Sequence, residues 1–180
     1  METKHSDIAI LYNSNSGNTR MVAEALERSL AGDGTQAAVV EITAESVARA
    51  AEAAAAADAV LVGFWCDKGS CTDEVAQVLS GLSGKRVFLF GTAGFGGAPA
   101  YFERILSAVR TKLPEDATYL GGAMCQGKMG QGVLARYEAM LAEKPGDARI
   151  TSMIDNFHAA LGHPDEADLA AIVRAARVAL

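Results

Sequence analysis

A strand, turn and helix near the N-terminus constrain this chain more than any other feature. The apolar run 8–12 has the pattern of a short buried strand, and apolar positions from Met21 to Leu30 recur with helical spacing. The first N–H groups of a helix have no intrahelical partner and carry the positive end of its dipole. The turn between the two elements therefore predicts a phosphate-binding site. It consists of Ser14, Asn15, Ser16, Gly17, Asn18 and Thr19.

An ordinary helix cap is the alternative for this turn, because Ser, Asn and Thr all cap helices. Six consecutive small residues, however, exceed what one cap requires. The turn lacks the Gly-Lys-Ser/Thr ending of a P-loop and the G-x-G-x-x-G of a dinucleotide site. It also lacks the Cys and Arg that a phosphatase nucleophile needs. We therefore expect it to hold a phosphate without cleaving it.

Composition narrows the class of protein. The 180 residues suit one domain with a substantial core, and half of them are hydrophobic. No apolar run approaches the roughly 18 to 20 residues of a membrane span, and the first seven residues are polar, so a cytoplasmic location is expected. The formal charge of -6 argues against nucleic acid or an anionic membrane as partner. Cys66, Cys71 and Cys125 lack C-x-x-C spacing, so no metal site is predicted.

Strand and helix patterns alternate along most of the chain. Further strands are expected at 36–42, 58–64, 85–90 and 118–124, with helices at 45–57, around Val75 to Leu79, at 99–112 and at 131–142. This alternation predicts an α/β fold, a doubly wound five-stranded parallel sheet. The helix 131–142 is expected to close the sheet unit, which ends at residue 144. Residues 145–180 are expected to form a helical C-terminal extension packed on that unit, with helices at 150–161 and 165–180.

Aromatic residues follow two of the expected strands. In an open parallel sheet, ligands lie at the carboxyl ends of the strands, where the strand order reverses. Trp65 follows the third strand and Phe95 lies among glycines after the fourth, so the two rings could sandwich a flat ligand. Trp65 could instead be a core residue at a strand end. A flat ring and a phosphate together outline a mononucleotide, with a flavin as the natural candidate.

The segment 12–19 resembles the FMN-phosphate loop of the flavodoxin family, whose pattern is Ser/Thr-x-Thr/Ser-Gly-Asn-Thr after the first strand. The resemblance implies the strand order 2-1-3-4-5, FMN as cofactor and residues 1–144 as the FMN-binding domain. It places the phosphate at Ser14, Ser16, Asn18 and Thr19, with Asn15 and Gly17 in the same loop. It places two further loops at the flavin ring: Trp65, Cys66, Asp67, Lys68 and Gly69 on one side, and Thr92, Ala93, Gly94, Phe95, Gly96 and Gly97 on the other.

More narrowly, segments 63–69, 91–97, 101–106 and 125–129 resemble flavodoxin-like proteins of anaerobic bacteria, some of which accompany a bilirubin reductase. The resemblance implies an electron-transfer protein that delivers reducing equivalents to a partner reductase. The alternative is an FMN-dependent NAD(P)H reductase that acts directly on a quinone-like or tetrapyrrole substrate. The sequence leaves open whether the chain is an enzyme, and no catalytic residue is predicted.

Several residues near the expected site have uncertain roles. Lys68 is expected either to stabilise an anionic reduced flavin or to be a solvated surface charge. Cys66 and Cys71 are expected to be semi-buried thiols rather than a redox pair. Contacts from Gln126 and Lys128 to the ligand remain open. The three histidines, His5, His158 and His163, have no carboxylate or Cys companion at catalytic spacing and are assigned no chemistry.

Overall fold

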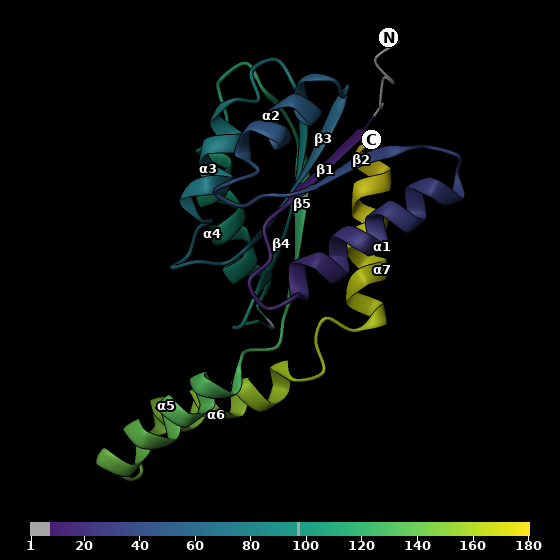
Figure 1. Cartoon of the computed structure of the whole chain (residues 1–180). Coiled ribbons are helices and arrows are strands. Elements are labelled where there is room, and N and C mark those ends of the chain that lie inside the picture. Colours follow the sequence, from purple (N-terminus) through teal and green to yellow (C-terminus); the bar gives the residue numbers. More distant parts are fainter. Residues whose placement is uncertain (1–7, 97) are drawn as a thin grey trace.

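The computed structural model describes residues 8–96 and 98–180, so the predicted site residue Gly97 and the histidine His5 lie outside the described residues. Its core is one five-stranded sheet in which all neighbours pair in parallel, in the order β2-β1-β3-β4-β5 (Figure 1). The expected fold class and strand order are confirmed. The strands are β1 (Ile8–Tyr12), β2 (Ala37–Glu41), β3 (Ala59–Trp65), β4 (Arg86–Ala93) and β5 (Thr118–Gln126).

Helices cover both faces of the sheet (Figure 1). On one face lie α1 (Asn18–Gly32) and α7 (Glu166–Ala179), which contact each other. On the other lie α2 (Val47–Ala55), α3 (Asp73–Ser80) and α4 (Pro99–Arg110). The central strands β1 and β3 are buried from both sides, which explains their almost continuous apolar sequences.

The two remaining helices do not cover the sheet. Helices α5 (Gln131–Glu143) and α6 (Ala148–Ala160) pack on each other as a hairpin that extends beyond the carboxyl ends of the strands (Figure 1). The expectation that the helix 131–142 closes the sheet unit is wrong, because α7 takes that place against β5. The physical reason is that α7 offers more apolar surface for burial than α5 does. Helix α5 has a single buried residue, Tyr137, whereas α7 buries Ile172 and Ala176 in the core beside α1.

The expected boundary at residue 144 falls between α5 and α6, inside this helical hairpin. Residues 145–180 contribute one helix to the hairpin and one to the sheet face. The division into residues 1–144 and 145–180 as separate units stays a prediction.

Strand β4 is longer than the sequence indicates, because Gly91 and Thr92 continue the pairing with Phe64 and Trp65 of β3. Thr92 and Ala93 are therefore strand residues, and the loop at this edge of the sheet begins at Gly94. The loop is therefore shorter than expected, and its first residue, Gly94, directly follows the last paired strand residues.

Candidate functional site

A cavity of about 470 Å³ lies at the carboxyl ends of β1, β3, β4 and β5. This is the sheet edge at which the switch-point rule places a ligand. Its wall also includes the first half of α5, so the helical hairpin contributes to the cavity. The lining residues are Asn15, Ser16, Asn18, Trp65, Cys66, Lys68, Gly69, Thr92, Ala93, Gly94, Phe95, Tyr101, Gly127, Lys128, Met129, Gly130, Val133, Arg136 and Tyr137.

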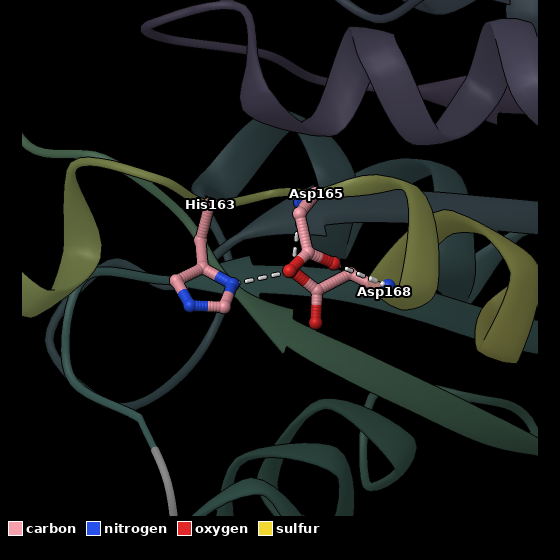
Figure 2. A group of neighbouring side chains, drawn as sticks. All are labelled: His163, Asp165 and Asp168. Carbon is pink, nitrogen blue, oxygen red and sulfur yellow. Dashed lines mark hydrogen bonds and ion pairs between the residues drawn. The ribbon is translucent and has the colours of Figure 1, made fainter.

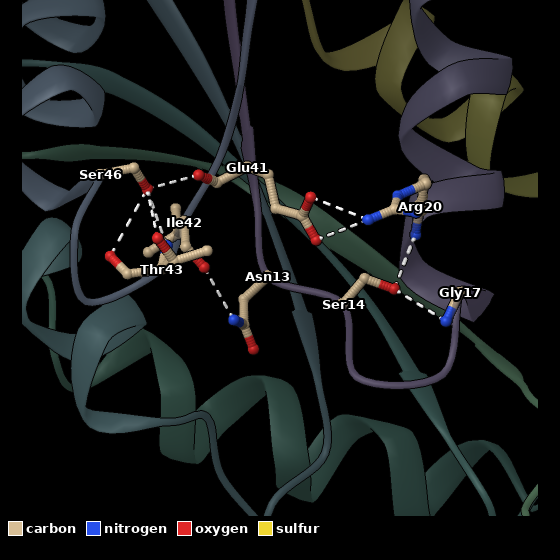
Figure 3. Close-up of polar contacts among 8 residues, drawn as sticks. All are labelled: Asn13, Ser14, Gly17, Arg20, Glu41, Ile42, Thr43 and Ser46. Carbon is tan, nitrogen blue, oxygen red and sulfur yellow. Dashed lines mark hydrogen bonds and ion pairs between the residues drawn. The ribbon is translucent and has the colours of Figure 1, made fainter.

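The loop before α1 is held by its own hydrogen bonds, as Figure 3 shows. The Ser14 hydroxyl accepts hydrogen bonds from the backbone N–H groups of Gly17 at 3.1 Å and Arg20 at 3.3 Å. Gly17 has a φ of 90°, in the left-handed region that favours glycine. The Arg20 guanidinium is paired with Glu41, with an N–O distance of 2.8 Å, and so is engaged outside the loop.

The backbone of this loop keeps donors free. In residues 8–96 and 98–180, the N–H groups of Asn15, Ser16, Asn18 and Thr19 have no hydrogen-bond partner. Three of these residues line the cavity, at the start of a 15-residue helix. Unpaired N–H groups and the positive end of the helix dipole suit a phosphate.

Two contacts tie the loop to distant strands. The Asn18 side-chain amide donates to the Lys128 carbonyl at 2.9 Å, and a Cβ at the adjacent Gly127 would lie 2.5 Å from the Asn18 amide nitrogen. The buried Thr19 and Thr92 hydroxyls lie 2.9 Å apart. The loop before α1 is thus positioned by β4 and by the segment after β5, which lies more than a hundred residues along the chain.

The loop after β3 contains a tight two-residue turn. Asp67 and Ser70 exchange two backbone hydrogen bonds of 2.9 Å, while Lys68 and Gly69 have φ values of 49° and 82°. Positive φ at both central residues defines a type I′ turn. Lys68 is the one non-glycine residue with positive φ in the described part of the chain, and it lies at the cavity.

The three cysteines are free thiols. Burial raises the pKa of Cys66 and of Cys71, and it raises the pKa of Cys125 to about 12. Only thiolates are good nucleophiles, so burial makes these thiols less reactive than an exposed cysteine. The interpretation of Cys66 and Cys71 as semi-buried thiols fits these environments.

The structure brings most of the expected site residues together. Trp65 is partly exposed and Phe95 is 38% exposed, and both line the cavity. Five of the expected residues belong to the same loops but do not line the cavity: Ser14, Gly17, Thr19, Asp67 and Gly96. The assignment of all the expected site residues to a cofactor, whether or not they line the cavity, stays a prediction.

Sequence reasoning missed the hairpin side of the cavity. Val133, Arg136 and Tyr137 lie one turn apart on α5, and Tyr101 begins α4. The helical spacing of 133, 136 and 137 was visible, but only the folded chain shows that this face meets the cavity instead of the sheet. Lys128, left open from the sequence, does line it, whereas Gln126 does not.

The expectation that His163 lacks a carboxylate companion is wrong. Its Nδ1 lies 2.6 Å from Asp168 Oδ2, because the chain turns at Pro164 into α7 (Figure 2). With Asp165 these side chains place three potential metal-ligand atoms within 4.8 Å of one another. Asp165 and Asp168, however, form the capping box of α7, each accepting a backbone N–H of the other at 2.9 Å. The cluster is therefore explained as a helix cap.

The His163–Asp168 pair predicts a pH dependence of stability. The hydrogen bond to Asp168 raises the pKa of His163, so the stabilisation is fully present below the unfolded value of about 6.5 and is lost as pH rises through the folded-state pKa. His163→Gln should lower the free energy of unfolding by about 0.5 kcal/mol at pH 6, the scale of a surface ion pair. This loss of unfolding free energy should be smaller at pH 9, because His163 is then uncharged in the wild type as well. Urea unfolding at the two pH values measures it.

His158→Gln is the matched control, because His158 is exposed on α6 and forms no ion pair among the described residues. An equal cost of His163→Gln at both pH values would contradict the assignment of the charged pair.

The sequence matches the flavodoxin domain family over residues 9–177, and the chain belongs to this family. It is similar to two flavodoxin-like domain-containing proteins named BilS. The one from Clostridium symbiosum (strain WAL-14163) is 42% identical over 172 residues, covering 91% of this chain and 90% of the relative. The one from Clostridioides difficile (strain CD3) is 35% identical over 112 residues, covering 62% of this chain and 64% of the relative.

The chain is also similar to a solved structure, the flavodoxin, WrbA-like protein from Agrobacterium tumefaciens. The TM-score is 0.52 at 16% identity, covering 97% of this chain and 99% of that protein. At this identity the similarity supports the fold alone. None of the helices in residues 8–96 and 98–180 is long and apolar enough to cross a bilayer.

Family membership makes FMN the expected ligand of the cavity, and the residues present fit it. The unpaired N–H groups at the start of α1 suit its phosphate. Trp65 and Phe95 present aromatic surface suited to its flat ring. Asn18 Oδ1 is buried without a hydrogen-bond partner in the described residues, so an acceptor remains for a ligand hydroxyl.

Proposed function

We propose that this protein binds FMN and carries electrons to a partner reductase. The observation that supports the proposal best is that one cavity contains both the unpaired helix-start N–H groups and the side chains of Trp65 and Phe95. FMN would supply the redox chemistry, and the protein would supply position and electrostatics.

In this proposal Asn15, Ser16 and Asn18 hold the phosphate through their backbone N–H groups, together with the Ser16 hydroxyl. Ser14 and Thr19 keep the loop in shape. The turn at Lys68 and Gly69 lies beside one edge of the ring.

For the partner we propose a bilirubin reductase. Support comes from the resemblance of segments 63–69 and 125–129 to proteins that accompany such a reductase, and from the similarity to two proteins named BilS. Mixing the FMN-loaded, prereduced protein with a purified bilirubin reductase should give flavin reoxidation that depends on bilirubin. Reoxidation at the same rate without the reductase would contradict this choice of partner.

A second candidate function is direct reduction of a small substrate with NAD(P)H. It is favoured by α5, because Val133, Arg136 and Tyr137 add a wall to the cavity that could shelter a substrate. Anaerobic mixing with NADPH distinguishes the two functions. An electron carrier should keep its yellow colour over many minutes, whereas a reductase should bleach at once.

The proposal also predicts a role for Lys68. Lys68 lines the cavity, and its ammonium group would stabilise negative charge on a reduced flavin. Lys68→Ala should therefore make the FMN midpoint potential more negative, on the order of tens of millivolts. Spectroscopic titration against a reference dye measures it. Lys144→Ala, at the far end of the helical hairpin, is the control, and equal potentials in both variants would remove Lys68 from the account.

A further inference from the structure

A side chain of the helical hairpin hydrogen-bonds to the loop after β4. Asn156 of α6 donates from Nδ2 to the Gly94 carbonyl at 3.1 Å. Gln126, at the end of β5, donates from Nε2 to the same carbonyl at 3.1 Å and to Asn156 Oδ1 at 3.1 Å. The Gly94 carbonyl oxygen is thus held by two amide donors that also contact each other.

This arrangement fixes the orientation of the next N–H group. In a trans peptide the C=O and N–H groups point in opposite directions. The Phe95 N–H therefore points away from Gln126 and Asn156, and it has no hydrogen-bond partner among the described residues. Because Gly94 and Phe95 both line the cavity, this donor is available to a ligand there.

The loop also packs closely against neighbouring segments at two of its glycines. A Cβ at Gly94 would lie 2.6 Å from Met129 Sδ, and a Cβ at Gly96 would lie 2.8 Å from Gln126 Cβ. The loop therefore rests on the end of β5 and on the segment leading to α5. Displacing α6 or this segment would displace the Gly94 carbonyl with it.

We infer that Asn156 and Gln126 are positioning residues that direct the Phe95 N–H toward the polar edge of bound FMN. Through Asn156, the helical hairpin would therefore influence the midpoint potential of FMN. The inference rests on the proposed function. Reduction adds negative charge to the ring, and a hydrogen bond to a charged acceptor is stronger than one to a neutral acceptor. The aimed N–H therefore stabilises reduced FMN more than oxidised FMN.

The test is Asn156→Leu, which has similar volume but no amide, in the FMN-loaded full chain. Its affinity for reduced FMN should fall about tenfold more than its affinity for oxidised FMN. For a two-electron couple this makes the midpoint potential about 30 mV more negative. Fluorescence titration gives the affinity for oxidised FMN, and dye-equilibrated reduction gives the potential.

Three further variants sharpen the result. Asn156→Gln keeps an amide donor and should restore much of the potential, whereas Ser152→Leu adds the same side chain at an exposed position of α6 and should change nothing. Gln126→Met should also make the potential more negative, and it replaces Asn156→Leu as the test if that variant does not fold.

Equal potentials in wild type, Asn156→Leu and Gln126→Met would overturn the inference. A wild type that binds no FMN would instead overturn the proposed function.

Discussion

Ser16→Asp is expected to weaken FMN binding about a hundredfold while leaving riboflavin binding nearly unchanged. Ser16 lines the cavity beside unpaired helix-start N–H groups, so the new carboxylate would face the phosphate, whose charge is close to -2. Repulsion between adjacent charges at such a site is worth about 3 kcal/mol, or roughly two powers of ten in affinity. Riboflavin lacks the phosphate and avoids this repulsion. Titration of flavin fluorescence measures both affinities.

Ser152→Asp controls for the added charge, because it lies on the exposed side of α6 away from the cavity. Parallel losses for FMN and riboflavin with Ser16→Asp would indicate general damage to the site. Unchanged FMN binding would place the phosphate elsewhere.

Gly63→Ala is expected to lower the free energy of unfolding by about 3 kcal/mol, since overpacking of a rigid core is costly. A Cβ at Gly63 in β3 would lie 2.3 Å from the Phe90 ring and 2.9 Å from Tyr12 Cβ. Phe90 is fully buried in the central sheet, so its ring has no free space to enter. Urea unfolding measures the loss.

Gly132→Ala is the matched control, because a Cβ there would meet no atom within 4 Å and the position is helical. It should leave stability unchanged or raise it by up to about 0.5 kcal/mol. If Gly63→Ala were as stable as Gly132→Ala, the core around Phe90 would be looser than the structure indicates.

Much of the fold could be predicted because its signals are local. The apolar runs at 8–12 and 58–64 predict buried strands, and β1 (Ile8–Tyr12) and β3 (Ala59–Trp65) lie there. The polar turn at 14–19 predicts the start of α1. Parallel pairing follows from alternation of strands and helices, since such connections must cross over the sheet. These inferences need no knowledge of distant contacts.

The packing of the C-terminal third was harder to predict. Its helices are easy to detect in the sequence, but the elements against which they pack are not. The helix patterns at 131–142 and 165–180 are both amphipathic, and chain order favoured the first as the cover for β5. The structure places α7 there instead. Which helix buries its apolar face against the sheet depends on complementary surfaces that meet only in the folded chain.

The sequence by itself determined the parallel sheet, the anion-suited loop before α1 and the aromatic residues at the edge where strand order reverses. Tertiary structure alone decided that α5 forms a wall of the cavity, that Asn156 holds the Gly94 carbonyl and that His163 meets Asp168. The physical reason is the separation along the chain of the residues that interact. Periodicity and turn chemistry act between near neighbours, whereas these contacts depend on how the elements pack in three dimensions.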